Sequence, residues 1–161
     1  MTADAGRKVA VRVVTSLGEI AKADWDACAN PASRGDPESD SSSAYNPFIA
    51  HDFLWSLEES GAATRKTGWL GQHLVVDGPD GRPAAILPAY LKSHSMGEYV
   101  FDQGWADAYE RAGGRYYPKL QSSVPFTPVT GRRLLVRPGP DADVHRRALA
   151  EAAVLLARQQ G

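Results

Sequence analysis

Residues 72–91, QHLVVDGPDGRPAAILPAYL, decide the fold of this chain. Two apolar runs, HLVV and PAAIL, flank a turn sequence that contains Asp80-Gly81, a dipeptide that favours tight hairpin turns. The sequence therefore predicts an antiparallel hairpin. Pro88 falls inside the second run and has no N–H to donate to a sheet, so it predicts an edge, a bulge or a kink at that point.

A helix is predicted directly before the hairpin, from Asn46-Pro47 to Gly61. Asn is a good cap, Pro suits the first helical position and Gly suits the end. We expect the buried face of this helix to carry Ile49, Phe53, Leu54 and Leu57. His51 and Trp55 lie off that stripe, and we expect them to face outward.

The rest of the chain adds short strands and helices. Strand candidates are residues 8–15, 98–102, 119–126 and 132–137. Helices are expected within residues 20–30 and 105–112, and after Asp143, which is expected to cap a terminal helix that buries Leu149, Ala152, Ala153 and Leu156. The polar, Pro- and Ser-rich segment 31–45 is predicted to be a mobile loop.

These elements predict an α/β (α+β) domain over residues 1–161, with a largely antiparallel sheet flanked by helices. The chain stops directly after the terminal helix. A helix with an apolar stripe normally packs beside a further strand in such a layout, so we expect this to be the N-terminal part of a longer protein, whose C-terminal half would be its partner.

Composition excludes several classes of function. The formal net charge is −1, which gives no basic footprint for DNA or other nucleic acid. The single cysteine, Cys28, excludes an internal disulfide and is expected to be a buried structural thiol, and the four histidines have no metal-ligand spacing, so no metal is expected. No signal peptide and no apolar run long enough for a membrane span is visible, which makes the cytoplasm the expected location.

The segment 90–131 has the composition of a cleft wall. Five of the six tyrosines lie in it, among lysines, a histidine and carboxylates, and Tyr suits places where one end of the side chain is dry and the other wet. The candidate proton-handling residues are His94 and Tyr99. The candidate substrate-binding residues are Lys92, Asp102, Trp105, Arg115, Tyr116, Tyr117, Lys119 and Gln121.

Each of these candidates also has a purely structural interpretation. The polar residues 92–95 are equally typical of a hydrated turn, and Asp102 is better explained as a helix cap. On an extended segment Arg115, Tyr117, Lys119 and Gln121 share one face, which favours recognition of a carboxylate, phosphate or peptide group. The alternative is the hydrated face of an edge strand.

The pieces NPFIAHDFLWSLEESG, TGW, QHLVV and LPAYLKSHSMGEYVFDQGWADAYERAGGRYYPKLQSSVPFTPVTGRRLL resemble a bacterial family. It is the FemAB-like family of peptidoglycan biosynthesis or recognition proteins, which is similar to the GNAT acyltransferases, and the resemblance covers about Asn46 to Leu135. It implies a GNAT-like sheet flanked by helices and transfer of an acyl or aminoacyl group to a small-molecule or peptide amine. The implied donors are acyl-coenzyme A or aminoacyl-tRNA.

Two departures from the wider superfamily limit this implication. The pyrophosphate loop of Q/R-x-x-G-x-G/A type is absent, and RPGPDAD, residues 137–143, stands in its place. The near-neutral charge gives no visible surface for tRNA. Two further hypotheses therefore stay open: a non-catalytic module that recognises a peptide or muropeptide, and a fragment that is inactive without the rest of the protein.

Overall fold

The structure, a computed structural model, describes residues 9–31 and 45–160. The predicted loop 31–45 lies almost wholly outside these residues. The strands are β1 (Arg12–Val14), β2 (Trp69–Gly71), β3 (His73–Asp77), β4 (Pro83–Leu87), β5 (Tyr90–Lys92), β6 (Lys119–Gln121) and β7 (Leu135–Val136). The helices are α1 (Lys22–Ala29), α2 (His51–Glu59), α3 (Gln103–Arg111) and α4 (Ala142–Gln160), with short 3-10 turns between some of them.

The predicted hairpin is confirmed. Strands β3 and β4 pair antiparallel, with Val75 opposite Ile86, and the turn between them closes through a bond from the N–H of Gly78 to the carbonyl of Arg82. The four-stranded sheet has the order β1-β3-β4-β7, and a three-stranded sheet has the order β2-β5-β6. All pairings among the described strands are antiparallel, so the α/β (α+β) class is confirmed, with no parallel pairing described.

One long hairpin runs through both sheets and is broken in the middle. Its first arm passes from β2 to β3 through Gln72, and its second arm passes from β4 to β5 through Pro88 and Ala89. At the break the N–H of Ala89 donates to Nδ1 of His73 at 3.2 Å, while the N–H of Gln72 donates to the carbonyl of Ala89 at 2.8 Å. A side chain thus replaces a strand partner where Pro88 interrupts the ladder, as its position predicted.

His73 also connects the break to α2. Because its Nδ1 accepts a hydrogen bond, its Nε2 carries the proton and donates to Glu58 Oε1 at 3.3 Å. The other oxygen of Glu58 accepts from Ser16 Oγ at 2.8 Å and from the N–H of Leu17 at 3.0 Å. Gly71 is required beside this network, since a Cβ there would lie 2.3 Å from the carbonyl oxygen of Thr15.

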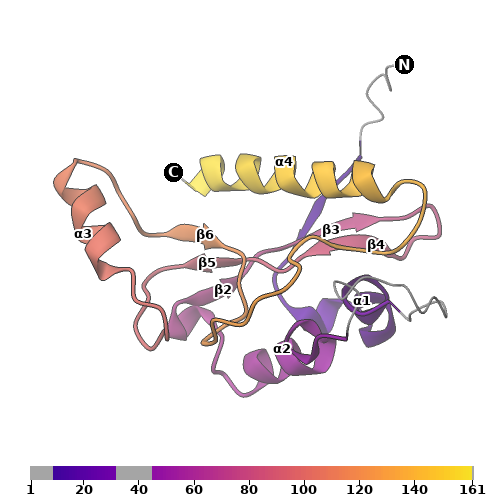
Figure 1. Ribbon diagram of the computed structural model, residues 1–161, viewed down its shortest axis with the longest axis horizontal. Helices are drawn as coiled ribbons and strands as arrows, with labels where there is room; N and C mark the ends of the chain where they lie inside the picture. The colour runs from indigo at the N-terminus through magenta and orange to yellow at the C-terminus, as the bar shows by residue number, and fades with distance from the viewer. Residues whose placement is uncertain (1–8, 32–44, 161) are drawn as a thin grey trace.

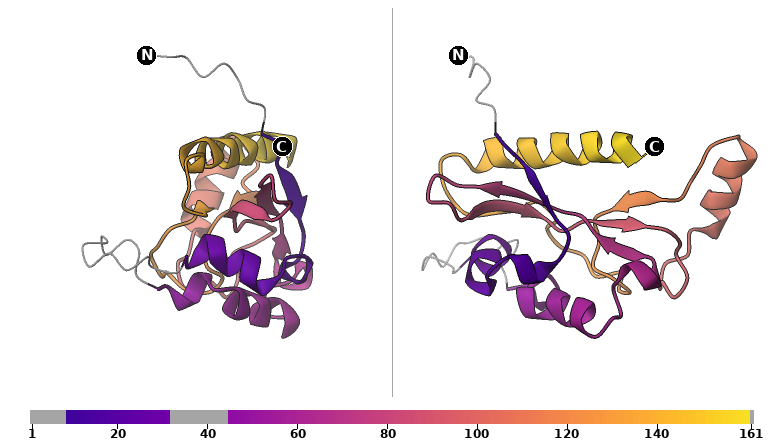
Figure 2. Two further views of the ribbon diagram at one scale, coloured as in Figure 1. Left: turned by 90° about the vertical axis from the view of Figure 1, so that its right-hand side faces the viewer. Right: turned by 180° about the vertical axis from the view of Figure 1, so that it is seen from behind.

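The elements form three layers. Helix α4 covers one face of the sheet and α1 and α2 cover the other, as Figures 1 and 2 show. The four-stranded sheet is therefore buried on both faces: Val75 and Ile86 point into the core beneath α1 and α2, whereas Leu74 and Leu87 point into the core beneath α4. Of the predicted stripe on α4, Leu149 and Leu156 are buried, and Ala152 and Ala153 pack partly against the same core.

Several local predictions were wrong for identifiable reasons. Residues 98–102 form no strand, because the chain leaves the sheet after Lys92 and no neighbour pairs with this segment. His51 is buried rather than outward, since its Nε2 lies 3.2 Å and 3.1 Å from the carbonyls of Leu17 and Ile20. The helix expected from Asn46 begins as a 3-10 turn, Pro47–Ile49, and becomes α-helical only at His51.

Other predictions held in part. The strand expected over 119–126 is formed only at β6, and that over 132–137 only at β7. Asp143 lies inside the first turn of α4. Cys28 is the expected buried thiol, and burial raises its pKa to about 12. Among the described residues, no helix combines the length and apolarity that crossing a membrane requires.

His73→Phe tests the role of the break. The aromatic contacts of this ring with Trp25 and Tyr90 can persist, but the buried N–H of Ala89 loses its acceptor and Oε1 of Glu58 loses its donor. We expect the free energy of unfolding, measured by urea titration, to fall by roughly 2–4 kcal/mol. His145→Gln, a change at a half-buried histidine of α4, is the control, and a loss no larger than that of the control would contradict this role.

Candidate functional site

The three-stranded sheet presents a polar and aromatic face on one side. Trp69 lies opposite Lys92, and Lys92 lies opposite Lys119, so these three residues form one row across β2, β5 and β6. Tyr90 and Gln121 form the next row on the same face, because side chains alternate along a strand. The opposite face carries Leu91 and Leu120 and is turned toward α4, so the two faces of this sheet differ sharply in chemistry.

An excursion of the chain covers the polar face. Between β5 and β6 the chain leaves the sheet over residues 93–118, hereafter the arm, which carries α3 away from the body of the protein (Figure 1). The arm exposes large apolar side chains: Met96, Tyr99, Val100, Phe101, Trp105 and Tyr109. Its base lies against β5 and β6 through two ion pairs, Lys92 with Glu98 and Lys119 with Asp102.

Asp102 is the centre of the first contact between the arm and β6. It is the N-cap residue of α3, as predicted, but its side chain makes no capping hydrogen bond. It accepts instead from Lys119 Nζ, from Tyr117 Oη at 2.7 Å and from Tyr116 Oη at 3.2 Å. Burial opposes the charge of this carboxylate, but the hydrogen bonds from Lys119 and Tyr117 outweigh it and hold the pKa of Asp102 well below its usual range.

The pKa values of two partners of Asp102, Tyr117 and Lys119, are shifted as well. Burial, followed by the bond to Asp102, raises the pKa of Tyr117, whose hydroxyl also lies 2.8 Å from Ser95 Oγ. Burial lowers the affinity of Lys119 for its proton, but the bond to Asp102 reverses this and raises the pKa of Lys119 above its usual value. At neutral pH this cluster is therefore a formed ion pair with two tyrosine hydroxyls attached.

Lys92 and Glu98 form the second contact, and both are buried. The side chain of Lys92 is 0% exposed and that of Glu98 is 10% exposed, with Nζ 2.7 Å from Oε1 and 3.5 Å from the centre of the Trp69 ring. The two groups form a close ion pair, and neither Nζ nor Oε1 has a further hydrogen-bond partner among the described residues. Burial lowers the pKa of Lys92, and Glu98 offsets only part of this effect.

Beside these contacts lies a pocket of about 230 Å³, hereafter the arm pocket. Its walls are the base of the arm, β6 and the segment that follows β6. It is lined by Ser95, Glu98, Tyr99, Val100, Asp102, Tyr116, Lys119, Gln121, Ser123, Val124, Thr127 and Pro128. The residue before Thr127, Phe126, has φ 62°, a left-handed conformation rare for a bulky side chain, and its ring packs on Trp69.

The arm pocket gathers half of the residues that the sequence singled out. Tyr99, Asp102, Tyr116, Lys119 and Gln121 line it. Tyr117 and Lys92 do not line it, but each contacts a residue that does: Tyr117 bonds Asp102, and Lys92 pairs with Glu98. Of the four residues that a spacing of two placed on one face, only Lys119 and Gln121 line the arm pocket.

The remaining predicted residues lie elsewhere. The His94 ring packs against Gly68, with Nδ1 accepting from the N–H of Met96, and it does not line the arm pocket. Trp105 is 74% exposed on α3. Arg115 is exposed and donates to the carbonyl of Gln160 at the end of α4.

Sequence reasoning missed Glu98 and Ser95. The composition around Glu98 predicts a strand, and that around Ser95 predicts a turn. The signal that was present is the spacing of Glu98 and Asp102 after Lys92, because two carboxylates four residues apart can each pair with one lysine of adjacent strands. That pairing requires knowing that β5 and β6 are neighbours.

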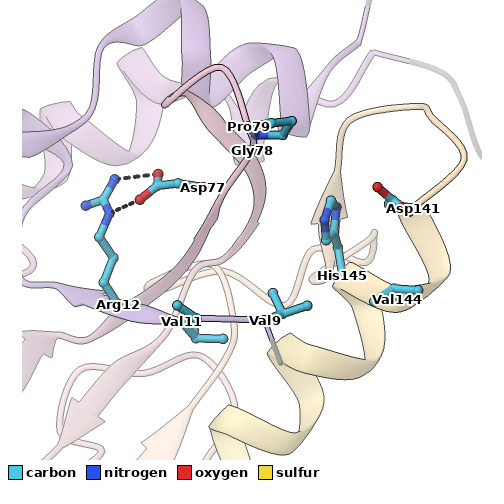
Figure 3. A pocket seen from close by; sticks show the side chains of 10 residues that line it. Val9, Val11, Arg12, Asp77, Gly78, Pro79, Asp141, Val144 and His145 are labelled. Atoms are coloured by element: carbon cyan, nitrogen blue, oxygen red, sulfur yellow. Dashed lines mark hydrogen bonds and ion pairs between the residues drawn. The ribbon is translucent and has the colours of Figure 1, made fainter. Parts of the chain in front are cut away.

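A second pocket lies at the other end of the molecule (Figure 3). It is formed by the start of β1, the β3–β4 turn and the first turn of α4, and it includes Arg12, Asp77 and His145. Arg12 and Asp77 bond each other, at 2.7 Å and 3.1 Å, so their charges are already satisfied. None of the residues predicted from the sequence lines this pocket, and no cluster of three or more metal-ligating side chains occurs among the described residues.

The fold is that of an α/β protein with an amphipathic pocket beside two ion pairs. Residues 16–161 match the FemAB-like family, described as peptidoglycan biosynthesis/recognition, and because the match covers most of the chain, the protein belongs to that family. The predicted resemblance is thereby confirmed, and with it a role connected with peptidoglycan biosynthesis or recognition. Comparison with curated proteins and with solved structures returned no match.

Asp102→Asn tests the cluster at the base of the arm. Because the pKa of Asp102 lies below the ordinary value of about 3.9, its contacts stabilise the folded state above that pH and cease to do so as the pH falls below it. We expect the variant to lose about 2 kcal/mol of unfolding free energy at pH 7, with the difference from wild type shrinking below about pH 4. Asp107→Asn, on the exposed surface of α3, should change stability by less than about 0.5 kcal/mol.

Proposed function

We propose that this protein binds the amine acceptor in an acyl- or aminoacyl-transfer step of peptidoglycan biosynthesis, and that the arm pocket is the acceptor site. The single observation that carries the proposal is the lining of this pocket, which combines tyrosine rings with hydroxyl, amide and charged groups. Such a mixture suits a peptide or sugar-peptide, whose surface alternates apolar and hydrogen-bonding groups.

The proposal needs three things of the protein: to position the amine, to remove its proton and to keep competing water away. Gln121 and Ser123, joined by a 2.7 Å hydrogen bond, offer donors and acceptors for positioning. Tyr99 stands at the rim of the pocket with a largely exposed hydroxyl-bearing side chain, which is consistent with proton handling. His94, the other candidate, does not line the pocket and carries less of the argument.

A second function, recognition without turnover, is favoured by the loop before α4. In the GNAT pattern this region would hold the pyrophosphate of the donor. Here Arg137 is committed to Asp80, with contacts of 3.1 Å, and Asp143 places a negative charge in the first turn of the helix. A negative side chain at this end competes with a bound phosphate.

A thermal-shift panel separates these functions. We expect a muropeptide to raise the melting temperature under both, whereas a donor such as acetyl-coenzyme A or an aminoacyl-tRNA should do so only for a transferase. Gln121→Ala should weaken muropeptide binding about 5- to 10-fold through the loss of one hydrogen-bonding group. Gln103→Ala, at an exposed position of α3 outside the pocket, is the matched control. No shift with any muropeptide would reject the acceptor site.

Tyr99→Phe tests proton handling in a transfer assay with a donor that the panel identifies. The change removes only the hydroxyl, so a role in proton transfer predicts a fall in kcat of about 100-fold or more with little change in KM. His94→Gln should lower kcat far less. Equal, small effects of the two changes would remove both residues from the reaction.

A further inference from the structure

The two carboxylates of the arm pocket differ in how much of their hydrogen-bonding capacity is used. Asp102 accepts from three donors, namely Lys119 and the hydroxyls of Tyr116 and Tyr117. Glu98 is paired with one ammonium group, that of Lys92 at 2.7 Å from Oε1, and no other described residue donates a hydrogen bond to it. An ionised carboxylate offers about four lone-pair sites, so Glu98 holds most of its capacity in reserve.

A buried polar group without a hydrogen-bond partner calls for a physical explanation. Oε1 of Glu98 is enclosed beside Lys92, but the residue lines the arm pocket, so a group that occupies the pocket would contact the second oxygen, Oε2. A carboxylate only accepts hydrogen bonds, which means that the matching group on the ligand must be a donor. Among the common donors, an amine forms the short, charge-assisted bond that a carboxylate favours.

Lys92 explains why this carboxylate can be kept in a buried position. Its ammonium group, which does not line the pocket, neutralises Glu98 and rests on the face of Trp69. The second pair, Lys119 with Asp102, is neutral as well. The pocket therefore carries no excess charge that would attract any cation from a distance, and discrimination rests on the local contact with Glu98.

We infer that Glu98 is the residue that recognises a free primary amine on the ligand of the arm pocket. Its position is fixed by the ion pair with Lys92, whose ammonium group lies over the Trp69 ring. This inference rests on the proposed function, because an acyl acceptor must present an unmodified amine. It assigns to Glu98 the selection of the amine from its acylated product, in which the nitrogen has lost its charge and most of its donor capacity. The pocket thereby binds substrate in preference to product.

The test compares two ligands that differ only at the amine. One is a muropeptide whose peptide carries a free primary amine, and the other is the same muropeptide with that amine acetylated. Isothermal titration calorimetry of the intact protein should give a dissociation constant about 10- to 100-fold lower for the amine form. Equal binding of both forms would overturn the inference while leaving the proposed acceptor site standing.

Variants assign the preference to Glu98 and control for folding. Lys92→Met combined with Glu98→Gln replaces the ion pair by neutral groups of similar size, a change that buried pairs often tolerate, and it should abolish the preference. Lys92→Met alone removes the charge that compensates the buried carboxylate, so it should weaken the preference without exchanging Glu98 itself. Arg12→Met combined with Asp77→Asn removes an ion pair from the other pocket and should change nothing.

Each remaining outcome decides the matter. A preference that survives in the double variant at residues 92 and 98 would overturn the role of Glu98. Failure of both muropeptides to bind the wild-type protein would reject the proposed function, and this inference would fall with it. Melting curves of every variant distinguish a lost contact from a lost fold.

Discussion

The fold depends on how one buried N–H, that of Ala89, finds an acceptor. Pro88 prevents the second arm of the hairpin from continuing its ladder, and the imidazole of His73 takes the place of the missing strand partner. Glu58 then binds the opposite nitrogen of the ring and, through its second oxygen, the start of the chain at Ser16 and Leu17. The side chain of Glu58, on α2, thus links the break at His73 to the segment that follows β1.

This break divides the hairpin into two parts that are covered by different elements. Beyond it on one side, β3 and β4 are covered on both faces and form the stable centre of the protein. On the other side, β2, β5 and β6 keep a polar and aromatic face whose buried rings, Trp69 and Tyr90, pack against Leu57 of α2, and the base of the arm closes over the rest with two ion pairs. The arm pocket lies at that boundary, where a rigid strand meets a projecting segment, an arrangement common to binding sites.

Much of the architecture could be predicted, because local patterns encode it. The Asp80-Gly81 turn, the consequence of Pro88 and the apolar positions of α4 are all properties of neighbouring residues. The errors have a common cause. Residues 98–102 have the composition of a strand but no partner, and His51 is polar by type yet is buried because two carbonyls lie within reach of its ring. Neither fact is visible without the packing.

For the site, the sequence by itself determined which stretch matters, since the density of tyrosines, lysines and carboxylates in residues 90–131 is a property of composition. The tertiary structure decided which of those residues meet. It joined Tyr99, Asp102, Tyr116, Lys119 and Gln121, left His94, Trp105 and Arg115 outside, and brought in Glu98. The physical reason is that β5 and β6 are neighbours across a 26-residue excursion, and only strand pairing sets Lys92 beside Lys119 and so fixes where the two carboxylates bind.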